Sequence, residues 1–218
     1  MTIMHHPSDV TLAAFVSGAL DEARGLVVVT HLSLCPQCRN AVRAFEHVGG
    51  ALLDQAAPEP MSADALDRAI ATLRNSQPDQ PNAPSALRVP QAQAASGLPA
   101  PLSRYALGSW RWIGRGVQWR AVDVSSSEGV RVFMLKAASG TRLPRHRHTG
   151  TEWTCVFEGA FRHDLGSYGP GDFDEADETV EHNPVVGNDV PCVCLVALQG
   201  QIHLQSWLGR LIQPLIRI

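Results

Sequence analysis

A proline-rich stretch divides this chain of 218 residues. Residues 75–101, NSQPDQPNAPSALRVPQAQAASGLPAP, hold six prolines, only two charged side chains and no apolar periodicity. Proline donates no backbone hydrogen bond, so this stretch is expected to form neither a helix nor a strand. We therefore expect two folded units, residues 1–75 and 102–218, joined by a linker over residues 76–101.

The first unit has the apolar spacing of α-helices. Ser8 and Asp21 can each cap a helix, and Pro36 suits the first turn of another because its missing N–H would be unpaired there anyway. The pattern predicts an all-α segment of four helices, over about residues 9–18, 21–34, 36–54 and 62–74.

From Trp110 onward the apolar period changes to two. Short runs rich in Val, Phe, Trp and Leu alternate with turns that contain Gly, Pro or Asp; they include VRVFMLKA, EWTCVFEG, GAFRHDL, PCVCLVALQG and QIHLQSWL. Many short strands indicate a β-sandwich or β-barrel. The predicted fold class is thus a two-domain chain, α followed by all-β.

The segment HLSLCPQC at residues 31–38 carries the first candidate site. His31 and Cys35 are four residues apart, on one face of a helix end, and Cys38 returns to that face after the Pro-containing turn. Zinc prefers four tetrahedral Cys and His ligands, so we expect a fourth from the pair His5–His6 and favour His6, which is nearer the first helix. A thioredoxin-like redox pair is the alternative, but it requires a preceding strand that the sequence does not contain.

The second candidate site lies in GTRLPRHRHTGTEWTCVFEG. His146 and His148 are two residues apart and so share one face of a strand, and Glu152 can join them from beyond a tight Thr-Gly turn. Two imidazoles and a carboxylate on one sheet face are typical of a divalent-metal site. His163 and His203 are interpreted as structural.

The second unit has three cysteines, of which Cys155 is interpreted as packing. Cys192 and Cys194 share one side of a strand and are poor disulfide partners for each other, because alternate residues lie about 6.5–7 Å apart. They either fill the interior of the β domain or lie near the metal. Cys155 should face away from Glu152.

Two resemblances follow from these motifs. Residues 1–75 resemble the zinc-binding anti-sigma domains, with His6, His31, Cys35 and Cys38 as the matching ligands. The spacing Gly-x5-His-x-His-x3-Glu-x6-Gly is similar to the first cupin motif, at Gly140, His146, His148, Glu152 and Gly159.

The second cupin motif is matched less closely. Pro170 and Gly171 supply its turn and His182 its histidine ligand, but the segment between them is longer than usual and Val186 replaces the usual asparagine. The resemblance implies a cupin barrel that holds a second divalent ion, zinc, iron or manganese, through His146, His148, Glu152 and His182.

An anti-sigma zinc domain, a linker and a cupin in this order are similar to the ChrR-type anti-sigma factors. The resemblance implies a regulator, not an enzyme, that sequesters an extracytoplasmic-function sigma factor and releases it when the cupin senses singlet oxygen or organic peroxides. A dioxygenase-like cupin enzyme with an accessory zinc domain is the alternative. A cupin that binds a small ligand without oxidant chemistry is a third possibility.

Composition excludes other classes of partner. The net charge is −3 and the chain has no Lys/Arg-rich run, so direct binding to nucleic acid is not expected. The sequence begins without a signal-like segment and contains no run of 18 apolar residues. We expect a cytoplasmic protein that does not enter a membrane.

Overall fold

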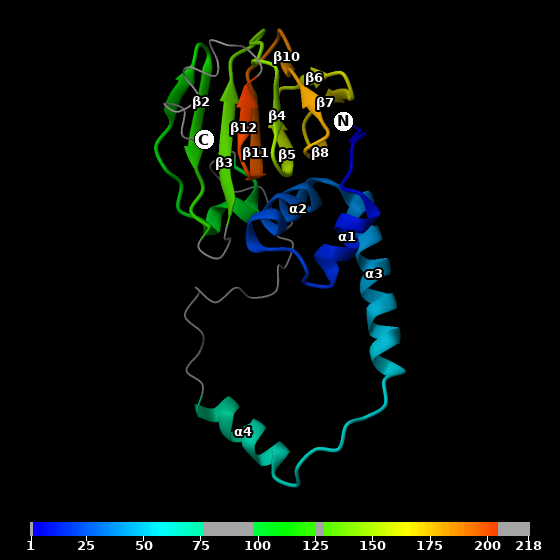
Figure 1. The fold of residues 1–218 in the computed structure, drawn as a ribbon. Helices are drawn as coiled ribbons and strands as arrows, with labels where there is room; N and C mark the ends of the chain where they lie inside the picture. Colours follow the sequence, from blue (N-terminus) through cyan, green and yellow to red (C-terminus); the bar gives the residue numbers. More distant parts are fainter. Residues whose placement is uncertain (1, 76–97, 125–128, 205–218) are drawn as a thin grey trace.

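The computed structural model describes residues 2–75, 98–124 and 129–204. Its first part is helical, as predicted, and its second part is built from strands (Figure 1). The helices are α1 (Asp9–Val16), α2 (Glu22–Leu34), α3 (Pro36–Asp54) and α4 (Ala65–Asn75), followed by the 3₁₀ helix η1 (Ala100–Arg104).

The predicted starts of the first three helices are confirmed. The Ser8 side chain accepts a hydrogen bond from the backbone N–H of Thr11, and the Asp21 side chain accepts one from that of Arg24. Pro36 opens α3 directly after Cys35, which ends α2 and also caps α3. Two helices therefore meet at a single cysteine.

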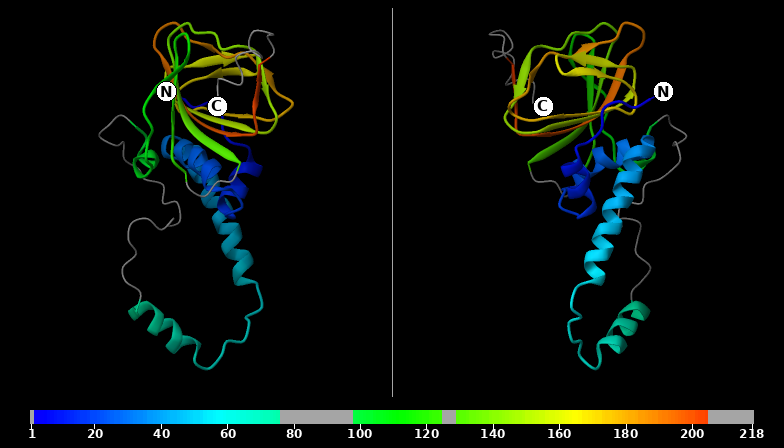
Figure 2. Two further views of the ribbon diagram at one scale, coloured as in Figure 1. Left: turned by 60° about the vertical axis from the view of Figure 1, so that its left-hand side comes forward. Right: turned by 90° about the vertical axis from the view of Figure 1, so that its right-hand side faces the viewer.

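Twelve strands make up the β domain within the described residues. A six-stranded antiparallel sheet has the order β1-β2-β3-β11-β5-β8, and two three-stranded sheets, β10-β6-β7 and β12-β4-β9, lie opposite it (Figures 1 and 2). The strands are β1 (Arg111–Gly114), β2 (Val117–Ala121), β3 (Val130–Ala137), β4 (His146–His148), β5 (Glu152–Glu158), β6 (Phe161–His163), β7 (Gly166–Tyr168), β8 (Phe173–Ala176), β9 (Glu181–His182), β10 (Val185–Val186), β11 (Cys192–Gln199) and β12 (Ile202–Leu204).

Helix α2 joins the helical region to the barrel. Its residues from Gly25 to Leu32 are all buried, and the apolar side chains among them, Leu26 to Val29 and Leu32, belong to one hydrophobic core with side chains of β3, β5, β8 and β11. The next side chains along those strands point the other way, into the barrel. The large sheet is thus covered on both faces, which explains why β3 and β11 are nearly continuous apolar runs.

The chain returns to this core after the proline-rich stretch. Leu98 is partly buried, and Pro101 and Leu102 are buried where η1 packs against α2. Of the predicted linker, residues 76–97 lie outside the described residues.

The second half of α3 and all of α4 extend away from the barrel (Figure 2). Every residue of α3 from Glu46 to Asp54 is exposed, and α4 has no buried residue. Within the described ranges, no helix is both long and apolar enough to cross a membrane.

Candidate metal centres

The structure brings His6, His31, Cys35 and Cys38 together in the helical region. The His31 Nε2 atom lies 3.2 Å from Cys38 Sγ, and His6 Nδ1 lies 3.3 Å from Cys38 Sγ and 3.5 Å from Cys35 Sγ. All four ligand atoms lie within 4.8 Å of one another. We call this set the helical cluster.

These separations fit a single tetrahedral ion. Bonds of about 2.0–2.3 Å to nitrogen and sulfur place neighbouring ligand atoms about 3.3–3.8 Å apart in a tetrahedron. Two thiolates and two imidazoles are a donor set that zinc prefers. His5 lies outside the cluster, and its ring packs against Tyr168 at 4.3 Å between centroids.

Burial shapes the protonation of the helical cluster. It lowers the pKa of His31 to about 4, which leaves this imidazole neutral and able to ligate at pH 7. Burial also raises the pKa of Cys38 to about 12, with a further contribution from Cys35. Without a cation the buried Cys38 thiol stays protonated, so a metal must displace its proton when it binds here.

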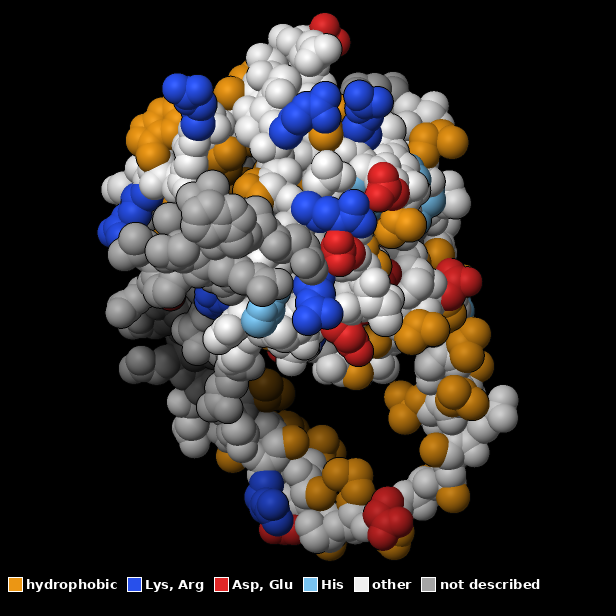
Figure 3. Space-filling model, turned by 45° about the horizontal axis from the view of Figure 1, so that its top comes forward, with side chains coloured by type: hydrophobic (Ala, Val, Ile, Leu, Met, Phe, Trp, Pro, Cys, Tyr) orange, Lys and Arg blue, Asp and Glu red, His pale blue; other side chains and the backbone are white. Residues whose placement is uncertain are grey.

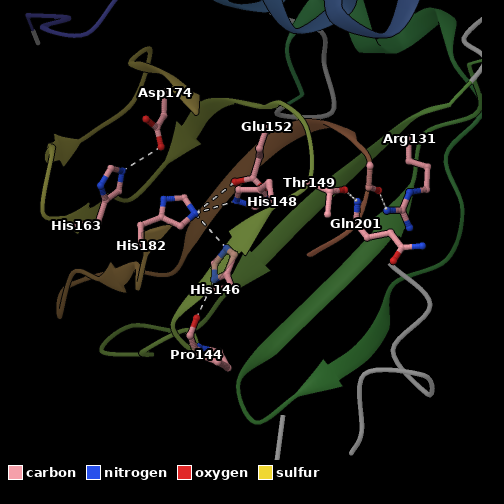
Figure 4. Close-up of polar contacts among 11 residues, drawn as sticks. Arg131, Pro144, His146, His148, Thr149, Glu152, His163, Asp174, His182 and Gln201 are labelled. Carbon is pink, nitrogen blue, oxygen red and sulfur yellow. Dashed lines mark hydrogen bonds and ion pairs between the residues drawn. The ribbon is translucent and has the colours of Figure 1, made fainter. Parts of the chain in front are cut away.

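The second cluster lies inside the barrel, where His182 stands between the other ligands and a neighbouring His–Asp pair (Figure 4). The Nε2 atoms of His146 and His148 lie 3.0 Å and 3.2 Å from that of His182. Glu152 places its two carboxylate oxygens 3.7 Å and 3.9 Å from ring nitrogens of His148 and His182. We call these four residues the barrel cluster.

Strand pairing positions the barrel cluster. His146 on β4 lies directly opposite His182 on β9, and His148 follows two residues later on the same face. Glu152 begins β5 in the large sheet, which faces β4 across the barrel. The backbone ladder alone therefore fixes the spacing of the two opposed histidines.

The polar contacts of the barrel cluster also favour an ion. His146 Nδ1 lies 2.7 Å from the Pro144 carbonyl oxygen, which can only accept, so Nδ1 carries the proton and Nε2 offers a lone pair. Among the described residues, the buried Nδ1 atoms of His148 and His182 have no hydrogen-bond partner. Three imidazole nitrogens that converge on one point are stabilised by a cation between them.

Burial shifts the pKa values of the barrel cluster. It lowers the pKa of His148 to about 4 and that of His182 to about 3, so both rings are neutral at pH 7. Burial raises the pKa of Glu152 to about 7. Neutral imidazoles beside a carboxylate that gains from a positive charge are the donors a divalent ion needs.

His163 has a polar partner that the sequence analysis did not foresee. Its Nε2 atom lies 3.0 Å from Asp174 Oδ2, while its Nδ1 accepts from the Leu165 backbone N–H. The His163 ring also lies 4.9 Å from that of His182, between centroids. The two partners are eleven residues apart on different strands, so only the topology brings them together.

Cys192 and Cys194 point into the barrel, and both are buried. A hydrogen bond with the Cys192 thiol raises the pKa of Cys194, and burial adds to this effect. Cys155, in contrast, belongs to the core shared with α2, on the other face of the sheet from the barrel interior. This is the side predicted for it.

Comparison with known proteins places both regions in one context. Residues 104–202 match the family model described as the ChrR Cupin-like domain. The anti-sigma-E factor ChrR of Cereibacter sphaeroides is 39% identical over 224 residues, an alignment that covers 100% of this chain and 100% of that protein.

A solved structure gives the same correspondence. Rhodobacter sphaeroides SigE in complex with the anti-sigma ChrR matches with a TM-score of 0.73 and 35% identity, and the match covers 91% of this chain and 100% of that chain. The similarity thus extends through the helical region and the barrel in the same order.

Proposed function

The chain belongs to the ChrR family of anti-sigma factors, and we propose that it sequesters an extracytoplasmic-function sigma factor through its helical region. The observation that carries this proposal is the full-length similarity to a protein solved in complex with SigE. Members of this family act by binding, so the family is one of regulators and not of dioxygenase-like enzymes.

The exposed helices supply the surface for this partner. Apolar side chains gather on the two stretches that extend from the barrel (Figure 3). On α4, Leu66, Ile70 and Leu73 recur at the spacing of one helix face, and they are 70%, 36% and 76% exposed. An eleven-residue helix with an uncovered apolar face is marginal by itself and is stabilised by docking into a groove.

The end of α3 offers a second apolar surface. Val48 and Leu52 lie one helical turn apart, with Leu53 beside them, and all three are more than half exposed. The first half of α3 packs around the helical cluster through Cys38 and Val42. A partner that binds the exposed second half of α3 would therefore depend on the metal, because the metal orients this helix.

We assign zinc to the helical cluster, through His6, His31, Cys35 and Cys38. Its donors and their spacing support this assignment. For the barrel cluster we propose a second divalent ion, held by His146, His148, Glu152 and His182. Three imidazoles and one carboxylate are donors that zinc, iron and manganese accept, and an octahedral ion held by these four ligands would keep open positions.

The signal is proposed to be an oxidant, singlet oxygen or an organic peroxide, which reaches the barrel cluster and leads to release of the sigma factor. An ion with open coordination positions can bind such a molecule directly. The place of action is the cytoplasm, where a sigma factor meets RNA polymerase.

Binding to a sigma factor is the direct test. Purified full-length protein should bind an extracytoplasmic-function sigma factor, and Leu66→Asp/Leu73→Asp should weaken binding at least about 30-fold, the loss of one interface hot spot of ~2 kcal/mol. Ala71→Asp adds a single negative charge on the opposite face of α4 and is the control, with nearly unchanged affinity. If both variants bind the sigma factor with equal affinity, the apolar face of α4 is not part of the binding surface.

A further inference from the structure

Strand β8 and the turn before it touch both clusters. Phe173 and Glu175 face the helical region, whereas Asp174 points into the barrel toward His163. Adjacent strand residues point to opposite faces, so a single strand can contact two sites at once.

The zinc ligand His31 takes its second polar contact from this turn. Its Nδ1 lies 2.7 Å from the Gly171 carbonyl oxygen, which fixes the proton on Nδ1 and leaves Nε2 for the metal. The edge of the His31 ring also meets Phe173, at 5.7 Å between centroids. The barrel domain thus orients a ligand that belongs to the helical domain.

The segment that carries His6 is tied to the same turn. The Asp172 carboxylate accepts hydrogen bonds from the backbone N–H groups of Met4, at 2.7 Å, and of His5, at 2.9 Å. The Phe173 N–H donates back to the His5 carbonyl oxygen at 3.0 Å. Asp172 is itself buried and bound to Gly169 N at 2.7 Å, so it is a fixed anchor for the residue next to His6.

Glu175 completes the contact. It accepts from the Thr11 hydroxyl at 2.5 Å and from the Ser8 N–H at 3.1 Å, both at the start of α1. Ser8 is the residue that caps α1. The N-terminal segment between His6 and α1 is therefore held at both ends by β8.

On the other face, β8 lies against the barrel cluster. Asp174 binds His163, whose ring packs on the ligand His182. In the sheet, Ala176 lies opposite Glu152, the carboxylate of the barrel cluster. When an ion leaves, a shift of His182 would reach β8 through His163 and Asp174. A shift of Glu152 would reach β8 through Ala176.

We propose that Gly171–Glu175 couples the two metal centres, so that an ion in the barrel cluster slows the loss of zinc from the helical cluster. The coupling deepens the proposed function, because it rests on both clusters holding metal. Coupling between binding sites is reciprocal, so zinc equally favours retention of the barrel ion. Residues Gly171–Glu175 act as positioning residues, because they hold the segments that carry the metal ligands and do not bind the metals themselves.

The rate of metal loss from the helical cluster measures this coupling. Full-length protein is loaded with Co²⁺, whose bonds to the thiolates of Cys35 and Cys38 would give a near-ultraviolet charge-transfer band that a site without thiolates lacks. Excess chelator is added, and the decay of the band is followed. Total metal content is measured in parallel, to verify that the barrel cluster is filled in the wild type.

Four proteins form a double-mutant cycle. They are the wild type, a barrel-empty variant His146→Ala/His148→Ala on β4, Asp172→Asn, and their combination. Each single change should speed decay by about 10-fold, the lower end of the 10–100-fold effect of losing support around a metal ligand. The combination should be no faster than the faster single change, because Asp172 and the barrel ion act along one route.

Tyr105→Phe is the matched control. It also removes one hydrogen bond to the helical region, 2.9 Å long and made to Glu22, but it lies away from β8. Its decay rate should equal that of the wild type. If Asp172→Asn does not fold, Glu175→Gln replaces it in the cycle.

Two outcomes would overturn the coupling. Equal decay rates for the wild type and the barrel-empty variant would show that the barrel ion does not reach the zinc. A combination about 100-fold faster than wild type, the product of two independent 10-fold effects, would show separate routes. If the wild type holds no barrel ion, the proposed barrel site is overturned together with the coupling. If the wild type holds both ions and the decay rates are still equal, the coupling alone is overturned.

Discussion

The two clusters differ in what holds their ligands in place. In the barrel cluster, His146 and His182 are neighbours in a β-ladder, so backbone hydrogen bonds fix them. In the helical cluster, His6 comes from a segment without regular structure, and its position depends on Asp172 and Glu175 of the barrel. The barrel cluster is built by its own domain, whereas the helical cluster is built by the two regions together.

The comparison teaches where a signal can act. The barrel cluster can lose its ion and keep its backbone ladder, so that only side chains such as His182 and Glu152 shift. A site made of a terminal segment and a helix junction needs its metal, because short helices have little stability of their own.

The largest effect is expected from the thiolate ligands. Cys35→Ala or Cys38→Ala should abolish zinc binding and loosen α1 to α3, because structural zinc contributes folding free energy directly. A protein of this size loses about 2–4 °C of melting temperature per kcal/mol of unfolding free energy. A loss of several kcal/mol therefore lowers the melting temperature by roughly 10–20 °C. Metal analysis and thermal unfolding followed by circular dichroism measure both effects.

Cys155→Ala is the control for these variants. It removes a buried thiol from the same core, but Cys155 is not one of the four ligands, so zinc content should stay at the wild-type level. Full zinc occupancy and full sigma binding in both ligand variants would refute the assignment of this site.

Emptying the barrel should cost much less stability. We expect His146→Ala/His182→Ala to lose one ion per chain, to melt within about 5 °C of the wild type and still to bind the sigma factor, because the ladder does not depend on these side chains. Release of the sigma factor by oxidant should be lost. If this variant still releases the sigma factor normally, the barrel ion has no part in sensing the oxidant.

Much of this architecture could be predicted from the sequence, because it is encoded locally. The caps Ser8 and Asp21, the proline that opens α3 and the apolar run of β3 each act within a few residues. The eight proposed ligands were also found from spacing and resemblance, and the structure brings them together as two groups of four.

The contacts between the two regions could not be predicted in the same way. Asp172 lies 167 residues after His5, and His163 meets Asp174 only because β6 and β8 belong to facing sheets. One signal was available. The run DFDE places three carboxylates in four residues, and acidic side chains are disfavoured in strands unless they have partners.

A substitution at Gly171, in the barrel domain, is expected to disturb the helical cluster less than the loss of a thiolate ligand. The φ of +91° at Gly171 disfavours other residues, and a Cβ here would lie 2.5 Å from the Ile3 side chain. Gly171→Ala should therefore cost more than the ~1–2 kcal/mol of a left-handed backbone alone. It should also speed zinc loss to a chelator while the barrel ion is retained.

Gly18→Ala separates these two contributions. Gly18 has a similar φ of +72° but no atom within 4 Å of a Cβ, so the variant carries only the backbone cost. Its zinc should leave at the wild-type rate. Equal rates for the two alanine variants would mean that the turn at Gly171 does not support the helical cluster.

The smallest effect is expected inside the barrel, at the two cysteines that line it. Cys192 and Cys194 are buried, and the pKa of Cys194 is raised by the Cys192 thiol and by burial, so Cys194 stays a thiol at neutral pH and is a weak nucleophile. Cys192→Ser/Cys194→Ser preserves shape, and we expect a loss of about 1–2 kcal/mol from burying two hydroxyls in place of thiols.

The barrel ion should remain, because neither thiol belongs to the barrel cluster. Release of the sigma factor by oxidant should weaken in a graded way, as the packing around Glu152 loosens, and Cys155→Ser on the other face of the sheet should leave release unchanged. Measuring release, metal content and unfolding on the same preparations separates packing from chemistry. Complete loss of release with the ion retained would make the thiol pair, and not the ion, the part of the barrel that reacts with the oxidant.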